Sequence, residues 1–253
     1  MNREEFSNGF STMLNSYATA ALHGDEASRA EIVLDEWEKS FFLTKAQDKV
    51  VLSFYGGNNT RGESFETSEE MRRYLAPLVC ESSPMEGEYT LEEEGTENEK
   101  KVYKTKSKFT LPKDLWFIIY ETMDGSSIEG DGCDAYYSNI EVYPVTHDEY
   151  NKIKNNPFRG PSEKRALRLD LGDHKVEIIC KKPVRGYSIR YIRKPKPILL
   201  EDFPNDLALG GVTKSVEPVC ELHEALHQTI LDEAVKLAYV SKSMGKSTEK
   251  DTK

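Results

Sequence analysis

The sequence predicts an α+β fold, with helices at both ends of the chain and a mostly antiparallel β core between them. Apolar residues recur at spacings of three and four near both ends, whereas the middle contains short strand-like runs between turn residues. The chain has 253 residues, 38% of them hydrophobic and 31% charged, which is enough to bury one or two cores. We therefore expect N-terminal helices, a β core with an acidic insertion, and a C-terminal helix packed back on the N-terminal ones.

Residues 1–77 are expected to form a helical region. A first helix should end at His23-Gly24-Asp25, because glycine permits the turn there. Thr44-Lys45-Ala46-Gln47 predicts a capping box that begins a second helix, and Gly56-Gly57 should end it. The apolar face of the first helix would carry Phe6, Phe10, Met13, Leu14, Tyr17 and Ala21.

A third helix should begin near Thr67 or Ser68 and end before Pro77, because proline disfavours helical geometry in the residue before it. Residues 78–145 then form a β-rich region with the acidic insertion. Its apolar run 115–120 has no polar alternation, so this strand should be buried on both faces. Further strands are expected at residues 101–106, 135–137 and 140–143.

Residues 146–218 are expected to hold a short helix, which begins at Thr146-His147-Asp148-Glu149, and three strands that form an antiparallel meander. Pro195 and Pro197 then restrict the backbone to an extended arm, better suited to reaching than to pairing in a central strand. Residues 219–240 should form the C-terminal helix and residues 241–253 a disordered tail. The meander strands are predicted at 166–171, 175–180 and 187–192.

Charge is distributed unevenly. The chain has a net charge of −10, yet residues 81–100 hold eight glutamates and one lysine, whereas residues 152–197 hold 14 basic and four acidic residues. This asymmetry indicates a polarised surface, unless the acidic run is simply a solvated loop. No apolar run is long enough to cross a membrane, and the first residues lack the apolar stretch of a secretory signal, so we expect folding in the cytoplasm of the producing cell. The four cysteines have no CxxC spacing and are expected to be reduced core residues.

The segment His223-Glu224-Ala225-Leu226-His227 matches HExxH on a predicted helix. In zinc hydrolases the two histidines bind the metal and the glutamate activates water. A zinc-dependent hydrolase that uses His223, Glu224 and His227 is therefore the alternative function. Against it, no histidine follows His227 to serve as the usual downstream third ligand, and Leu226 is needed on the apolar face of the helix. We expect no catalytic residues, no metal site and no cofactor.

The basic stretch is interleaved with tyrosines, as in some nucleic-acid-binding surfaces, and this is a third possibility. Strand alternation would divide these residues between two faces, and the chain as a whole is acidic. Contact with an acidic neighbouring subunit fits the opposed charges better. The candidate partner-contact residues are Arg159, Lys181, Lys182, Arg185, Arg190, Arg193, Lys194 and Lys196.

Several strings in the same order resemble a virion-protein family of crAss-like short-tailed phages. They are residues 34–47 (LDEWEKSFFLTKAQ), 155–161 (NNPFRGP), 190–198 (RYIRKPKPI) and 220–227 (CELHEALH), the last followed by a helix that contains Ile-Leu-x-x-Ala-Val. No single string is diagnostic, and their collinearity carries the resemblance over most of the chain apart from residues 81–100.

The resemblance implies a non-enzymatic head-to-tail connector or tail-barrel ring protein. Its implied partners are further copies of itself in a dodecameric ring, the portal protein, the next tail ring or tail protein, and genomic DNA that passes through non-specifically; no membrane partner is implied. The implied location is the neck or tail barrel of the virion, after assembly in the bacterial host cytoplasm. An acidic channel wall would repel the passing DNA and so prevent it from sticking.

Overall fold

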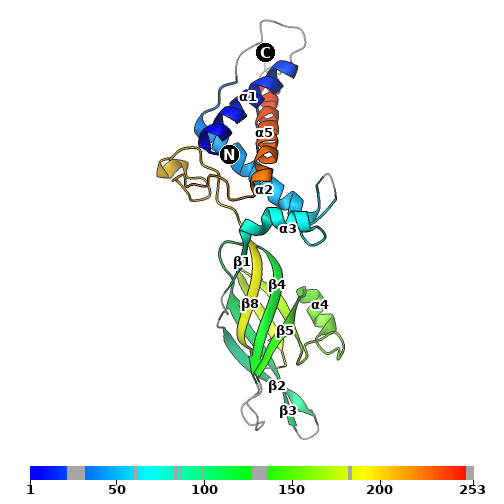
Figure 1. Ribbon diagram of the computed structural model, residues 1–253. Coiled ribbons are helices and arrows are strands. Elements are labelled where there is room, and N and C mark those ends of the chain that lie inside the picture. Colours follow the sequence, from blue (N-terminus) through cyan, green and yellow to red (C-terminus); the bar gives the residue numbers. More distant parts are fainter. Residues whose placement is uncertain are drawn as a thin grey trace. The chain divides into compact units, whose positions relative to one another are not determined.

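The computed structural model describes residues 1–21, 32–59, 62–82, 85, 87–97, 100–126, 136–181 and 184–248 (Figure 1). The chain divides into two compact units: a helical unit of Met1–Leu78 and Pro195–Lys253, and a sheet unit of Val79–Lys194. Helices together with a mixed sheet confirm the predicted α+β class. Among the residues described, no helix is both long and apolar enough to cross a membrane.

The helical unit is built around its C-terminal helix, which packs against two N-terminal helices as predicted. Gly9 permits close packing, because a Cβ atom there would lie 2.9 Å from Cδ2 of Leu231. The helices are α1 (Arg3–Ala21), α2 (Glu36–Gly56), α3 (Glu69–Leu75) and α5 (His227–Thr248), with 3₁₀ turns at Ala76–Leu78, Asn205–Leu207 and Glu224–Leu226. Their buried side chains include Phe6, Phe10, Leu14, Leu43, Val50, Val51, Ile230, Leu231, Ala234 and Val235.

The N-cap of helix α2 lies nine residues earlier than the Thr44 capping box predicts. The capping box is formed instead by Asp35, whose carboxylate accepts from the backbone N–H of Glu38 at 2.6 Å, and by Glu38, which accepts from the N–H of Asp35 at 3.4 Å. A real capping box leaves the residues before it outside the helix. Thr44 fails this condition because helical residues precede it. The predicted end at Gly56 is confirmed, with Gly57 at φ 74° as the left-handed cap.

The extended segment after Pro195 does not act as a free arm, because it packs along α2. The side-chain amide of Gln47 donates to the carbonyl of Lys196 at 2.8 Å, and the Thr44 hydroxyl accepts from the N–H of Ile198 at 3.1 Å. The Ser40 hydroxyl accepts from the N–H of Leu200 at 3.0 Å. Ile198, Leu199 and Leu200 are all buried, so the segment is part of the helical core. We call residues 195–200 the strap.

Of the two remaining helices of this unit, one has the predicted bounds and the other does not. Helix α3 begins after Ser68 and ends at Leu75, which confirms the predicted span before Pro77. Helix α5 differs at both ends, because it begins at His227 after a 3₁₀ turn and continues to Thr248, whereas the sequence predicted a helix that ends near Tyr239.

The sheet unit contains one sheet of eight strands in the order β1-β8-β4-β5-β6-β7-β3-β2. All pairs are antiparallel except β5 and β6, which are parallel and are connected through α4 (His147–Ile153). The Thr146 hydroxyl caps α4 by accepting from the N–H of Glu149 at 3.2 Å, as its sequence predicts. The strands are β1 (Val79–Glu81), β2 (Glu88–Glu97), β3 (Lys100–Thr110), β4 (Leu115–Ser126), β5 (Tyr136–Pro144), β6 (Arg165–Gly172), β7 (Lys175–Cys180) and β8 (Val184–Arg193).

The predicted three-stranded meander is correct for β6 and β7 and wrong for β8. Strands β6 and β7 pair through a turn with positive φ at Gly172, Asp173 and His174. The other edge of β7 pairs with β3, and β8 pairs with β4 and β1 instead. The sequence connection between β7 and β8 therefore crosses from one part of the sheet to another.

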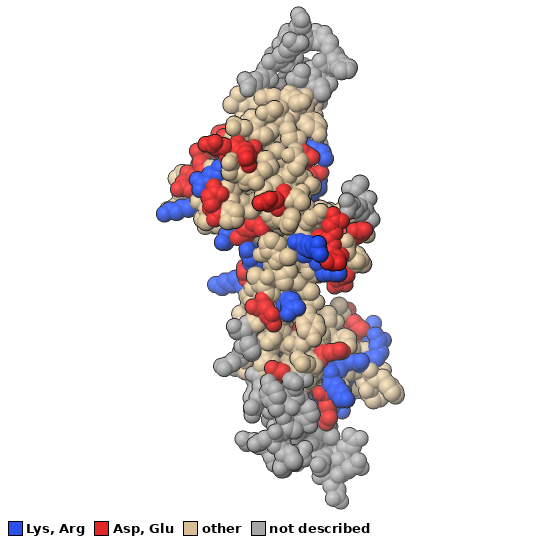
Figure 2. Space-filling model, in the orientation of Figure 1, with Lys and Arg blue, Asp and Glu red and all other residues tan. Residues whose placement is uncertain are grey.

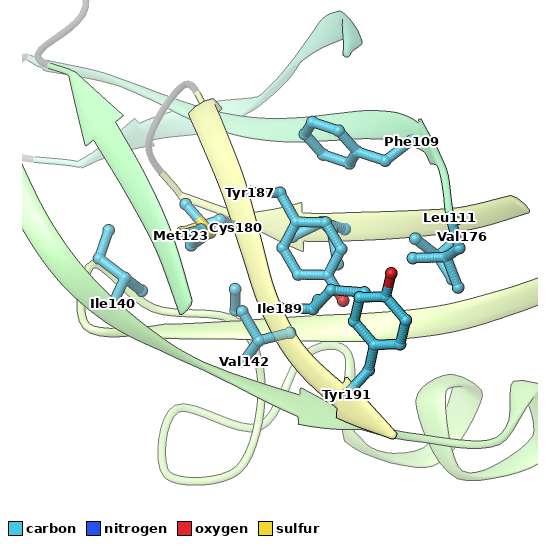
Figure 3. Close-up of a cluster of buried hydrophobic side chains, with 12 residues drawn as sticks. Phe109, Leu111, Met123, Ile140, Val142, Val176, Cys180, Tyr187, Ile189 and Tyr191 are labelled. Atoms are coloured by element: carbon cyan, nitrogen blue, oxygen red, sulfur yellow. The ribbon is translucent and has the colours of Figure 1, made fainter. Parts of the chain in front are cut away.

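The sheet curls around a single apolar core (Figure 3). Four strands separate β3 from β8 in the strand order, yet the rings of Phe109 and Tyr187 lie 5.2 Å apart. Side chains of β3 to β8 converge on this core, and its buried members are Phe109, Leu111, Met123, Ile140, Val142, Ala166, Val176, Ile178, Cys180, Tyr187, Ile189 and Tyr191. Curling lets one sheet supply both walls of its own core.

The prediction that residues 115–120 are buried on both faces is wrong. Leu115 to Ile119 are only partly buried and Tyr120 is 54% exposed. The curled sheet has an inner face and an outer face. Among the described helices, none packs extensively against the outer face of β4. The continuous apolar run therefore belongs to a strand that is only partly buried. Farther along the same strand, Glu121 and Met123 are buried.

Candidate partner-contact surfaces

Within the sheet unit, the predicted basic residues that the structure describes do not all lie together. Lys196 belongs to the strap of the helical unit, whereas the others lie in the sheet unit. Within the sheet unit, Arg193 pairs in register with Leu115 at one end of β8, and Lys181 lies beyond its other end, near Val184. The ten residues of β8 separate these ends by about 30 Å at about 3.3 Å per residue. Lys182 is outside the described residues, and the structure describes the backbone but not the side chain of Arg185.

Among the described side chains, at least three of the basic residues form ion pairs within the chain. Arg159 lies 3.3 Å from Glu149, Arg190 lies 3.3 Å from Glu81, and Lys196 lies 3.4 Å from Glu221. Each of these basic side chains is more than half exposed, so the pairs contribute little to stability. Arg193 and Lys194 also take part in interactions. The visible face accordingly shows acidic and basic side chains interspersed (Figure 2).

The acidic run is a strand that pairs with a basic one. In the β2–β3 hairpin, Glu88 is opposite Lys108, Glu92 is opposite Lys104, and Glu97 is opposite Lys100. Strand β2 also lies at one edge of the sheet, and β7 pairs only with positions 105–110 of β3. Residues 88–97 of the acidic run thus belong to a paired strand rather than to a loop.

The HExxH-like segment does not lie on one regular helix. His223 caps a 3₁₀ turn, where its Nδ1 accepts from the N–H of Ala225 at 3.2 Å, and its ring lies 5.6 Å from that of Tyr74. His227 begins α5 and is 6% exposed. The 3₁₀ turn alters the spacing of four residues that would align two ligands on an α-helix.

Both ring nitrogens of His227 already have partners. Nε2 donates to the carbonyl of Leu222 at 3.2 Å, which leaves Nδ1 as an acceptor, and the amino nitrogen of Met1 lies 2.8 Å from it. Burial, followed by the nearby ammonium charge, lowers the pKa of His227. Within the described part of the chain, no three His, Cys, Asp or Glu side chains are grouped as metal ligands. These contacts give His227 a structural role between Leu222, which precedes the 3₁₀ turn, and α1, whose Phe6 ring lies 5.5 Å away.

The interior of the sheet contains a buried polar network that the sequence analysis did not identify. The carboxylate of Glu121 accepts from Arg168 at 2.8 Å and from the Tyr187 hydroxyl at 2.6 Å. Burial raises the pKa of Glu121, and it also raises that of Tyr187. A single glutamate directly after the apolar run 115–120 was the sequence signal available for this site. The network is enclosed by core residues and supplies no nucleophile beside a base, so we interpret it as structural.

Comparison with known proteins identifies the class as structural virion proteins that form rings in phage tails. The chain belongs to the family described as phage tail ring protein 3/4, whose model matches residues 1–250. It is 41% identical over 250 residues to "Ring protein 3" of Bacteroides phage crAss001, covering 96% of this chain and 97% of that protein. It is 27% identical over 248 residues to "Ring protein 4/5" of the same phage, covering 94% and 92%. The resemblance inferred from the sequence strings is confirmed.

Proposed function

We propose that twelve copies of this chain form a ring that joins the portal to later tail components and surrounds the DNA passage. The match over residues 1–250, with relatives covered almost from end to end, is the observation that supports this proposal. The role is architectural rather than catalytic. Portal attachment and the copy number go beyond family membership and follow from the idea that a connector ring adopts the symmetry of the portal above it. Assembly would take place in the bacterial host cytoplasm.

The net charge of −10 supports the proposal that the ring surrounds the DNA passage. A wall with negative potential repels the phosphate backbone, so DNA can move through without being held. Contact with the genome would then be non-specific. A dedicated nucleic-acid-binding surface is less well supported, because Arg159, Arg190 and Lys196 are each paired with a carboxylate of the same chain.

We further propose that the exposed basic residues contact acidic groups on neighbouring subunits. The intrachain pairs of Arg159, Arg190 and Lys196 are solvent-exposed, so exchanging their carboxylate partners costs little. Complementary charges across a subunit interface mainly guide encounter and register. The same proposal extends to Lys181, Lys182, Arg185, Arg193 and Lys194.

Electron microscopy of this protein mixed with the portal protein of the same genome tests the adaptor role. We expect an additional ring stacked on the narrow end of the portal, with twelvefold symmetry. Bare portal rings at high protein concentration would contradict attachment to the portal and assign the ring to a lower level of the tail. A symmetry other than twelvefold would contradict the copy number alone.

A further inference from the structure

The loop after α4 presents an exposed aromatic side chain from a firmly held backbone. Phe158 is 85% exposed, the largest exposed fraction among the described large hydrophobic residues. The Asn156 side chain accepts from the N–H of Phe158 at 2.8 Å and from the N–H of Arg159 at 3.2 Å. Asn156 therefore folds the backbone of this loop in the manner of an Asx turn.

Two further contacts hold the same loop. The N–H of Gly160 donates to the carbonyl of Asn156 at 2.8 Å, and a Cβ atom at Gly160 would lie 2.6 Å from that oxygen, so only glycine fits. The guanidinium of Arg165 donates to the carbonyl of Phe158. The loop is thus ordered before any partner binds, which reduces the entropy lost on binding. We call residues 154–159 the knob.

The helical unit has a groove of about 510 Å³ that matches the knob in chemistry. Its apolar floor comes from α2, α3 and the start of α5, with Val50, Met71 and Leu226 buried beneath it. The charged residues that line it are Glu70, Glu233 and Lys49. The Lys49 ammonium lies 2.6 Å from the Glu233 carboxylate, so Glu70 gives the lining its net negative charge.

We propose that the knob of one copy docks in this groove of the next copy, with Phe158 on the apolar floor. The knob carries Lys154 and Arg159 and no acidic residue, so its charge complements the lining of the groove. An aromatic side chain of this kind removes about 150–250 Å² from water when it is buried, and aromatic residues are enriched at the centres of subunit interfaces. The second copy is therefore the occupant that the charges and the apolar surfaces favour.

The geometry of this contact suits a ring. Knob and groove are different surfaces of the chain, so the contact is heterologous and repeats from copy to copy until the rotation closes. A self-complementary patch would instead stop at a dimer. The inference rests on the ring of the proposed function, but it does not depend on attachment of that ring to the portal.

Photochemical crosslinking in assembled phage tails tests the contact directly. Phe158 is replaced by p-benzoylphenylalanine, which keeps an aromatic ring at the apex of the knob, and irradiated tails are digested and mapped by mass spectrometry. We expect adducts between chains that map to α2, α3 or residues 225–233. Adducts that map to a different tail protein, to another surface of this chain or within one chain would overturn the proposal, as would intact tails without adducts.

Incorporation of single variants gives a second, independent test. Phe158→Ala should lower the amount of this protein in tails at least tenfold, whereas Phe158→Leu, which keeps apolar bulk, should retain most of it. Leu171→Ala, at another exposed apolar residue of the sheet unit, is the matched control and should be incorporated like the wild type. Unchanged melting temperatures of the free proteins show that folding is not the cause. Incorporation of Phe158→Ala at the wild-type level would overturn the proposed docking of the knob in the groove. Bare portals in the microscopy experiment would contradict only the proposed adaptor role.

Discussion

Arg168 and Glu121 form an ion pair of 2.8 Å inside the curled sheet, where their side chains are only 10% and 7% exposed. Arg168 comes from β6 and Glu121 from β4, strands that β5 separates. The Tyr187 hydroxyl of β8 donates to the second oxygen of the same carboxylate. One carboxylate therefore links three strands through the core.

Removing one member of this buried pair should destabilise the protein strongly. Arg168→Ala leaves the Glu121 carboxylate buried with the tyrosine hydrogen bond alone, and such breakage costs about 3–5 kcal/mol. Denaturant unfolding measures the change in the free energy of unfolding. Arg190→Ala removes an exposed pair with Glu81 and serves as the control, with an expected cost of about 0–1 kcal/mol. Equal effects of the two variants would contradict the interpretation.

The stability contributed by Glu121 should depend on pH in a defined direction. Burial raises the pKa of its carboxyl above the ordinary value of 4.5, so the native state holds this proton more tightly than the unfolded chain does. The stabilising contribution is complete below pH 4.5 and is lost as the pH rises through the raised pKa. Glu121→Gln removes this titration.

Relative to Glu121→Gln, the wild type should therefore lose free energy of unfolding as the pH increases from 4.5 towards neutrality. Urea unfolding of both proteins at several pH values gives the difference directly, and other titrating groups cancel between them. A difference that stays constant or changes in the opposite direction would contradict a raised pKa for Glu121.

The strap should depend on the buried amide of Gln47. Gln47→Leu leaves the carbonyl of Lys196 without its donor, and an unsatisfied buried polar group costs about 1–3 kcal/mol. Denaturant unfolding should show this loss. Gln228→Leu is the matched control, because the amide of Gln228 donates to Asp232 on an exposed part of α5, and its effect should be within about 0.5 kcal/mol. A Gln47→Leu variant as stable as the wild type would mean that the hydrogen bond from Gln47 to Lys196 contributes nothing measurable to the stability of the strap.

Chelation should not alter the stability of this protein. Both ring nitrogens of His227 are engaged by Leu222 and Met1, so a zinc ion would have to displace existing contacts. Dialysis against EDTA followed by thermal unfolding should give an unchanged melting temperature, and added zinc should not raise it. A melting temperature that falls after dialysis and is restored by stoichiometric zinc would support the alternative function as a zinc-dependent hydrolase.

Cys220 should be almost unreactive in the native protein. Burial raises the pKa of its thiol to about 11, so roughly one part in a thousand is thiolate at about pH 8, and the thiolate is the nucleophile. Alkylation with iodoacetamide, followed by mass spectrometry, should label Cys220 only after unfolding. The partly buried Cys80 provides a comparison within the same chain. Rapid labelling of native Cys220 would show that the segment around it opens locally.

Local signals in the sequence were sufficient where a few neighbouring residues decide the structure. Thr146 predicted the cap of α4, Gly56-Gly57 predicted the end of α2, and Ser68 with Pro77 bounded α3, all as observed. The capping signal at Thr44 failed because the same residue types also serve as buried hydrogen-bond partners. There, the hydroxyl binds the strap 154 residues away in sequence.

The sequence by itself determined the α+β class, the helices and most strands, and the family, because periodicity, caps and collinear strings are properties of neighbouring residues. The tertiary structure decided that β8 joins β4 rather than β7, that Arg168 meets Glu121, and that the strap packs on α2. It also showed that Phe158 is exposed on a firmly held loop and that the described candidate basic residues of the sheet unit do not all lie together. Such pairings join residues far apart in the chain, and they are selected by the burial of the whole core, which no local pattern encodes.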